Sequence, residues 1–201
     1  MTALRKRNFS RTALGISALG VALLPVATYA ATASTSNIQI SAAIGSAISI
    51  NTPTAVAVSL TPTAAGPVSI GSHTVTVSTN NSTGYKLYLK DADATLNLVS
   101  GANNITPTAG SAGTPAALSA MNTFGYAVAG APFAGSYTTG DNRVYSASET
   151  FAGITASDVQ IKNTATTATN ENTSVYWAVR ADTSLPNGTY TDNVVYTAIT
   201  N

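Results

Sequence analysis

Between residues 38 and 50 the chain alternates between apolar side chains and small or polar ones. The apolar positions recur at every second residue, a period typical of a β-strand, whose successive side chains point to opposite faces. At roughly 3.3 Å per residue the stretch would span about 43 Å, longer than an ordinary strand. We therefore expect either two strands with a kink at Gly45-Ser46 or one long strand with a special use. Its isoleucines are Ile38, Ile40, Ile44, Ile48 and Ile50.

Shorter alternating stretches follow, separated by clusters of Pro, Gly and Asn that are typical of turns. No long helical period occurs after the first 33 residues. About nine or ten short strands joined by turns indicate an all-β protein, and we predict an immunoglobulin-like antiparallel β-sandwich. The expected strands are residues 55–60, 72–78, 85–90, 95–99, 124–128, 143–146, 158–162, 174–181 and 190–200.

Two of these strands have a clear inward face. The turn sequence Asn-Asn-Ser-Thr-Gly at residues 80–84 predicts a hairpin over residues 72–90. A second turn, Pro186-Asn187-Gly188, precedes Tyr190, which stands where a tyrosine corner would brace the next strand. We expect structural roles for Trp177 and Tyr190. The predicted inward residues are Tyr85, Leu87 and Leu89 in one strand and Val175, Trp177 and Val179 in the other, where Tyr176 lies on the opposite face.

The first 30 residues have the three-part layout of a secretory signal peptide. Four basic residues between Arg5 and Arg11 come first, an apolar stretch over residues 13–26 follows, and small residues end the segment. Cleavage is expected after Ala30 or Ala33, and the apolar stretch is short for a membrane-spanning helix. We therefore predict an exported protein with one domain over residues 31–201 and no membrane span in the mature chain.

Export changes the charge of the chain. Removal of the leader leaves five basic and eight acidic residues, a net charge of about −3, so no basic surface for nucleic acid is expected. The chain has no cysteine, which excludes disulfides, thiol catalysis and lipid attachment through an N-terminal Cys. Charged residues make up only 8% of the sequence, which is typical of a neutral surface outside the cell rather than of a cytosolic enzyme.

Few residues are suited to catalysis or to metal binding. His73 is the only histidine, and no nucleophile motif accompanies it, so we expect an exposed or edge-strand residue and no enzyme. Asp91 and Asp93 could join Asp141 around calcium, but the spacing of a calcium loop is absent and turn positions explain these residues better. We predict neither a metal site nor a cofactor. Residues 100–122 are rich in Ala, Gly, Thr and Pro and are expected to form an irregular segment, either a binding loop or a tolerated insertion.

Aromatic side chains offer a different kind of binding surface. Tyr88, Tyr137 and Tyr145 are candidates for stacking against sugar rings. Packing in the core or along strands is the competing interpretation for each of them.

Two segments carry a resemblance to a known family. Residues 185–200, Leu-Pro-Asn-Gly-Thr-Tyr-Thr-Asp-Asn-Val-Val-Tyr-Thr-Ala-Ile-Thr, resemble the C-terminal strand of spore coat protein U and related secreted pilin-like proteins. Residues 74–89, which contain Ser-Thr-Asn-Asn-Ser-Thr-Gly-Tyr, are similar to their central hairpin, and these motifs with Phe124 to Val128 are closest in style to uncharacterised surface proteins of small-genome bacteria. The resemblance implies an immunoglobulin-like sandwich used for assembly or adhesion, with no catalytic residues.

Together these features predict a secreted, cell-surface structural or adhesive module that is not an enzyme. Residues 34–50 would be an N-terminal extension or a donor strand that completes the sheet of another subunit or surface protein. The competing interpretation makes them the first strands of their own sandwich. The alternative function is a carbohydrate-binding adhesin that uses loop aromatics, and calcium with them, to bind glycans.

Overall fold

The structure is a computed structural model that describes residues 38–93, 95–129, 145 and 149–201. The predicted signal peptide and Tyr137 lie outside these ranges. The chain divides into two compact units, residues 1–42 and residues 43–201. Of the first unit, residues 38–42 are described, and they form no strand. The second unit carries all the strands discussed below.

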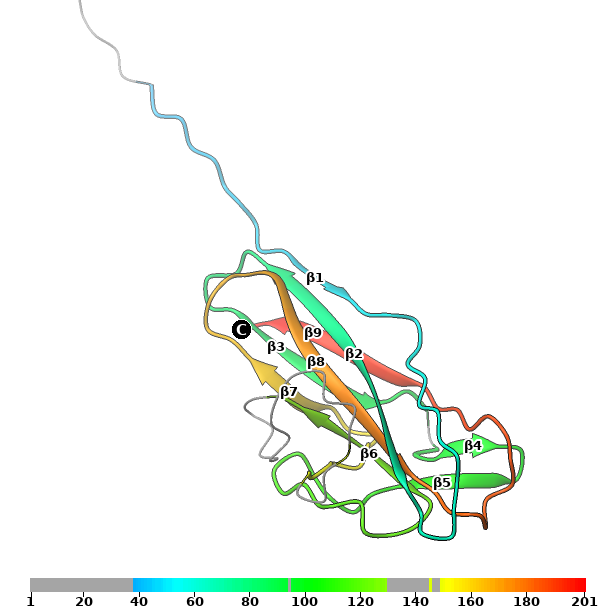
Figure 1. The fold of residues 1–201 in the computed structure, drawn as a ribbon. Helices are drawn as coiled ribbons and strands as arrows, with labels where there is room; N and C mark the ends of the chain where they lie inside the picture. Colours follow the sequence, from blue (N-terminus) through cyan, green and yellow to red (C-terminus); the bar gives the residue numbers. More distant parts are fainter. Residues whose placement is uncertain (1–37, 94, 130–144, 146–148) are drawn as a thin grey trace, which may run out of the picture. The chain divides into compact units, whose positions relative to one another are not determined.

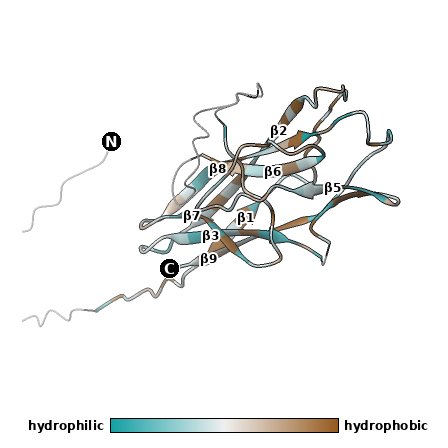
Figure 2. Ribbon diagram, turned by 90° about the horizontal axis from the view of Figure 1, so that it is seen from below, coloured by the Kyte–Doolittle hydropathy of each residue, from teal (hydrophilic) through white to brown (hydrophobic). Residues whose placement is uncertain are grey.

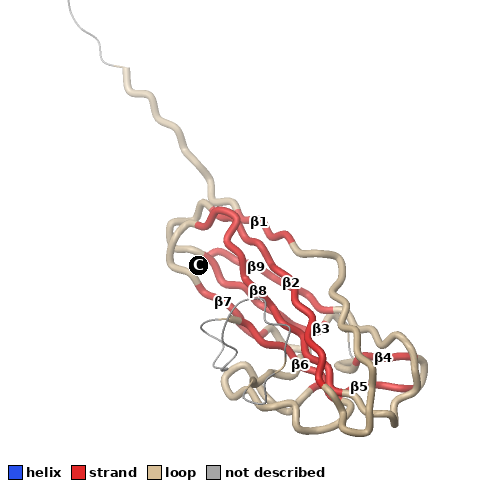
Figure 3. The backbone as a smooth tube through the Cα atoms, in the orientation of Figure 1, coloured by secondary structure: helices blue, strands red, loops and turns tan. Residues whose placement is uncertain are grey.

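The described residues form nine β-strands and no helix, which confirms the predicted all-β class (Figure 1). The larger sheet has six strands in the order β1-β2-β8-β6-β5-β4, and the smaller has three in the order β7-β3-β9 (Figure 3). The strands are β1 (Ile48–Asn51), β2 (Val68–Thr79), β3 (Tyr85–Asp91), β4 (Leu98–Ser100), β5 (Asn103–Pro107), β6 (Thr123–Val128), β7 (Val159–Asn163), β8 (Ala168–Arg180) and β9 (Val194–Thr200).

The antiparallel pair β2 and β8 is the longest ladder of the larger sheet. Its register runs from Val68 opposite Arg180 to Thr79 opposite Ala168, with one irregularity after Val77. Within the smaller sheet, β3 pairs with β7 on one side and with β9 on the other. The predicted hairpin over residues 72–90 is therefore wrong, because β2 and β3 belong to different sheets and do not pair with each other. The turn at residues 80–84 connects the two sheets.

A single hydrophobic cluster takes side chains from both sheets. Tyr85, Leu87 and Leu89 of β3 are fully buried, which confirms the inward face predicted for this strand. Val175 and Trp177 of β8 are buried as expected, and hydrophobic residues concentrate along these strands (Figure 2). Fully burying side chains of this size contributes about 1.5–3 kcal/mol each.

The opposite face of the larger sheet is also covered where β6 and β8 meet. Tyr176 is only 2% exposed, and all six residues of β6 are buried. Phe151 and Ala152 lie beside β6, where Ala152 and Tyr126 form an isolated antiparallel bridge and exchange two backbone hydrogen bonds of 2.8 Å. Sequence alternation alone could not indicate this bridge, because it comes from a distant segment without a strand period.

Several expected elements differ from the observed ones. Only Ile48–Asn51 of the long N-terminal stretch forms a strand, and it ends just before Thr52-Pro53, where proline supplies no N–H for a ladder. Residues 55–60 form no strand. They run against β2, where a side chain at Gly71 would lie 2.8 Å from the Ala57 carbonyl. Strand β5 lies within the segment expected to be irregular, and of residues 143–146 only Tyr145 is described.

Candidate functional site

The structure divides the five candidate assembly isoleucines into two groups. Ile38, Ile40 and Ile44 are 86%, 93% and 87% exposed. Ile48 and Ile50 belong to β1, where Ile48 packs against the core and Ile50 is 39% exposed. β1 pairs with β2 of the same chain. Residues 38–47, which have the same alternating sequence, pair with no strand in the structure.

Polar contacts to the turn after β2 fix the chain just before β1. Asn80 Oδ1 accepts a hydrogen bond from the backbone N–H of Ala47 (2.7 Å), and Asn80 Nδ2 donates to the Gly45 carbonyl (2.8 Å). The hydroxyl of Thr79 donates to the Ala47 carbonyl at 2.8 Å. Two open hollows of about 450 Å³ each adjoin Asn80, and their lining consists of hydroxyl, amide and apolar groups, Ile48 in one and Ile44 in the other, without a titratable side chain. The anchor therefore leaves Ile44 exposed on its N-terminal side.

Strand β9 forms an edge of the smaller sheet. It pairs with β3 on one side, while β1 approaches it without pairing. Its inward residues are only partly buried, although they pack against the core, and its outward residues Val195 and Ile199 are 38% and 45% exposed. The partly buried inward residues are Val194, Tyr196 and Ala198. This strand is therefore less covered than its neighbour β3.

Three carboxylates meet where β3 ends and β9 is about to begin. Asp91, Asp93 and Asp192 each place an oxygen within 4.8 Å of the others. Asp91 is 3% exposed, and its Oδ2 is buried without a hydrogen-bond partner, as is Oδ2 of Asp192. Their other oxygens accept backbone N–H groups, from Asp93 to Asp91 (2.7 Å) and from Asn193 to Asp192 (2.7 Å).

The electrostatics of this cluster are unfavourable for three negative charges. Burial raises the pKa of Asp192 to about 6, and the neighbouring carboxylates of Asp91 and Asp93 raise this pKa further in the same direction. Among the described residues no Lys or Arg forms an ion pair with the cluster, since the two pairs are Lys90 with Asp158 and Lys162 with Glu171.

The sequence offered Asp141 as a third carboxylate beside Asp91 and Asp93, and Asp141 lies outside the described residues. The structure brings Asp192 to the pair, a residue that sequence reasoning did not consider there. The contact follows from the register of β3 with β9, which sets Asp91 opposite Val194. Only knowledge of that strand pairing could have predicted the contribution of Asp192.

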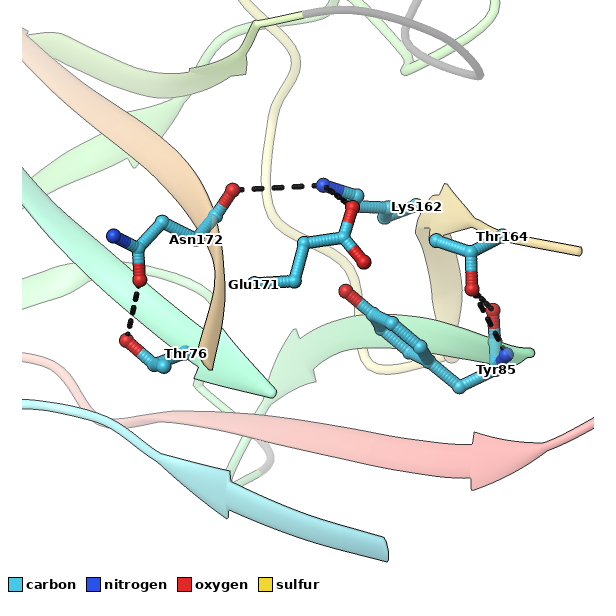
Figure 4. A network of polar contacts seen from close by, with 6 residues as sticks. All are labelled: Thr76, Tyr85, Lys162, Thr164, Glu171 and Asn172. Carbon is cyan, nitrogen blue, oxygen red and sulfur yellow. Dashed lines mark hydrogen bonds and ion pairs between the residues drawn. The ribbon is translucent and has the colours of Figure 1, made fainter. Parts of the chain in front are cut away.

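A second polar network joins the two sheets (Figure 4). Lys162 of β7 lies 2.7 Å from Glu171 of β8, and its ammonium also donates to the Asn172 carbonyl at 3.5 Å. The phenol of Tyr85 faces Glu171, and burial, with the Glu171 carboxylate as a second cause, raises the pKa of Tyr85 to about 12. These groups link the sheets, and the tyrosine stays neutral at ordinary pH.

The other candidate residues do not converge on one site. Tyr88 is half-buried on β3, opposite Thr197 of β9, and Tyr145 packs against the hydrophobic core. Trp177 is 7% exposed, and its ring contacts those of Phe124 and Tyr126 at centroid distances of 6.4 Å and 5.7 Å. The Tyr190 hydroxyl donates to the Pro186 carbonyl at 2.9 Å.

His73 lies on β2 and is half-buried. Its ring meets that of Tyr196 edge to face at 5.4 Å, and its Nδ1 is buried without a hydrogen-bond partner. Burial lowers the pKa of His73.

Within the part of the chain that is described, no helix has the length and apolar character needed to cross a membrane. The sequence matches no known protein family, no curated protein and no solved structure.

Proposed function

We propose that this protein is a secreted, non-enzymatic surface module with an immunoglobulin-like sandwich fold, and that copies of it assemble by β-strand addition. Residues 38–44 of one copy, which precede the contacts to Asn80, form the added strand, and the unpaired edge of β9 on a second copy accepts it. The observation that carries this proposal is the exposure of Ile38, Ile40 and Ile44 at 86%, 93% and 87% in a stretch that keeps a strand period. Large apolar side chains in such a row are typical of an interaction segment.

The alternating isoleucines of the donor segment match the incompletely covered inward face of β9. An added strand places alternate side chains on the core side, so Ile38, Ile40 and Ile44 would lie together over the partly buried inward face of β9. Burying each isoleucine contributes about 1.5–3 kcal/mol before the cost of association.

β9 is also the least protected of the edges. Natural sheets guard their edge strands with charges, prolines or short length. β9 has seven residues, none of them charged and none proline, whereas β1 has four, β4 has three and β7 has five including Lys162. Strand addition by another chain is therefore least opposed at β9.

Two features support the immunoglobulin-like assignment. Both sheets contribute to one core, as in a sandwich. The hydrogen bond from Tyr190 to Pro186, four residues upstream, has the form of a tyrosine corner. Export and surface location rest on the predicted leader, and the only histidine lies half-buried beside Tyr196 rather than in a catalytic arrangement.

Analytical ultracentrifugation of the exported, processed protein tests the proposal. We expect concentration-dependent oligomers, and we expect the triple variant Ile38→Ser, Ile40→Ser, Ile44→Ser to sediment as a monomer. Its thermal unfolding should match that of the wild type measured at a dilution where the wild type is also monomeric, because the exposed isoleucines add no core contact within the chain.

Val56→Ser serves as the control, since Val56 is 36% exposed and lies outside both donor and acceptor. It should assemble like the wild type. A wild-type protein that stays monomeric at millimolar concentration would refute the assembly, and a marked loss of stability in the triple variant would show that these isoleucines pack within their own chain.

A further inference from the structure

We infer that Asp91, Asp93 and Asp192 bind a calcium ion that fastens the end of β3 to the start of β9. This inference does not rest on the assembly proposal. The three residues come from the last position of β3, the loop after it and the segment before β9, so one ion would join two segments about a hundred residues apart in sequence.

The spacing of the oxygens suits calcium. Two ligands of a common ion can lie no farther apart than twice the metal–oxygen distance. That limit is about 4.6–5.2 Å for calcium. One oxygen from each carboxylate lies within 4.8 Å of the others, which calcium can span in full.

Burial of an unpartnered carboxylate oxygen points independently to a ligand. Asp91 is 3% exposed, and its Oδ2 has no hydrogen-bond partner. A buried anionic oxygen without a donor is costly, and native proteins pair such groups or use them to coordinate metals. Oδ2 of Asp192 is in the same condition, so two buried oxygens in one cluster lack donors.

The charge of the cluster leads to the same conclusion. Three carboxylates repel one another, and no described Lys or Arg forms an ion pair with them. A divalent cation would neutralise most of this charge, while the backbone N–H groups of Asp93 and Asn193 would hold the remaining oxygens in place. Calcium sites of extracellular modules have dissociation constants of about 10⁻⁴–10⁻³ M, which is the range expected here.

Calorimetric titration and thermal unfolding of the EDTA-treated, exported protein test the inference. We expect one saturable calcium site per chain, and a rise in melting temperature of about 3–6 °C at a calcium concentration ten times the dissociation constant. Magnesium at the same concentration should give a much smaller rise.

Asp192→Asn gives the decisive comparison. It removes one of the repelling charges and keeps an amide oxygen, so the calcium-free variant should melt above the calcium-free wild type while losing the calcium response. A residue with only a structural role would lower the melting temperature instead. Asp158→Asn removes the same charge from an exposed carboxylate that pairs with Lys90, and it should keep the full response.

The inference is overturned if calcium up to 10 mM produces neither heat nor a thermal shift, or if Asp192→Asn responds as the wild type does. An equal response to magnesium would overturn the assignment to calcium.

Discussion

At the scale of single residues, the informative positions are polar groups buried without a partner. His73 Nδ1 and the Oδ2 atoms of Asp91 and Asp192 all lack hydrogen bonds. His73 lies on β2, Asp91 ends β3, and Asp192 precedes β9. The aspartates gain a partner if a cation binds. The histidine has the aromatic ring of Tyr196 as its neighbour, and that ring cannot accept a proton. The neutral imidazole is therefore the form that the fold favours.

His73 makes a pH-dependent contribution to stability. Burial lowers its pKa in the folded protein, so the unfolded chain binds the proton more readily. This contribution is fully present above the unfolded pKa of about 6.5 and is lost as the pH falls through the folded value. In urea unfolding between pH 8 and 5, the wild type should lose stability relative to His73→Phe below about pH 6.5.

Asp192 is present in both proteins, so its titration cancels in this comparison. Its raised pKa acts in the opposite direction, stabilising the folded chain at low pH and losing that effect as the pH rises to about 6. Parallel pH profiles for the wild type and His73→Phe would contradict the role assigned to the histidine.

At the scale of elements, local alternation predicted strands better than it predicted their partners. The period of two in β3 and β8 correctly placed Leu87 and Val175 in the core. β5 was missed because its sequence, Asn-Asn-Ile-Thr-Pro, has a single apolar residue that is buried. The pairing of β3 with β9 depends on residues about a hundred positions apart and was not predicted. Asp192, the third aspartate of the cluster, was missed for the same reason. Such long-range contacts leave no mark in local sequence.

The turn after β2 must pass very close to the chain that follows β7. Gly84 has φ +82°, and a Cβ there would clash with the Thr164 carbonyl oxygen. Gly84→Ala should therefore destabilise the protein by about 2–3 kcal/mol, measured by urea unfolding.

Gly101→Ala separates the two causes. Gly101 has φ +60° but no neighbouring atom within 4 Å of a new Cβ, so only backbone strain, about 1 kcal/mol, is expected. Equal losses for the two variants would show that the close approach to Thr164 contributes nothing.

At the scale of the whole molecule, the central feature is that one segment lacks a strand partner and one sheet edge lacks a paired strand. The stretch before β1 has a strand pattern without forming a strand, and β9 has an edge with which no described strand pairs. The sequence predicted the first, because alternation is local. It could not predict the second, since an edge is defined only by which strands pair elsewhere in the chain.

Disulfide trapping tests the proposed assembly most directly, because the chain has no cysteine of its own. Ser41→Cys, on the outward face of the donor, is combined in turn with Val195→Cys, Thr197→Cys and Ile199→Cys. Paired strands bring cysteine Cα atoms to the distance of about 4.4–6.8 Å that a disulfide requires. We predict that at least one combination oxidises to a ladder of covalent multimers, while each single cysteine stops at a dimer. Monomers or dimers alone in all three combinations would contradict strand addition at β9.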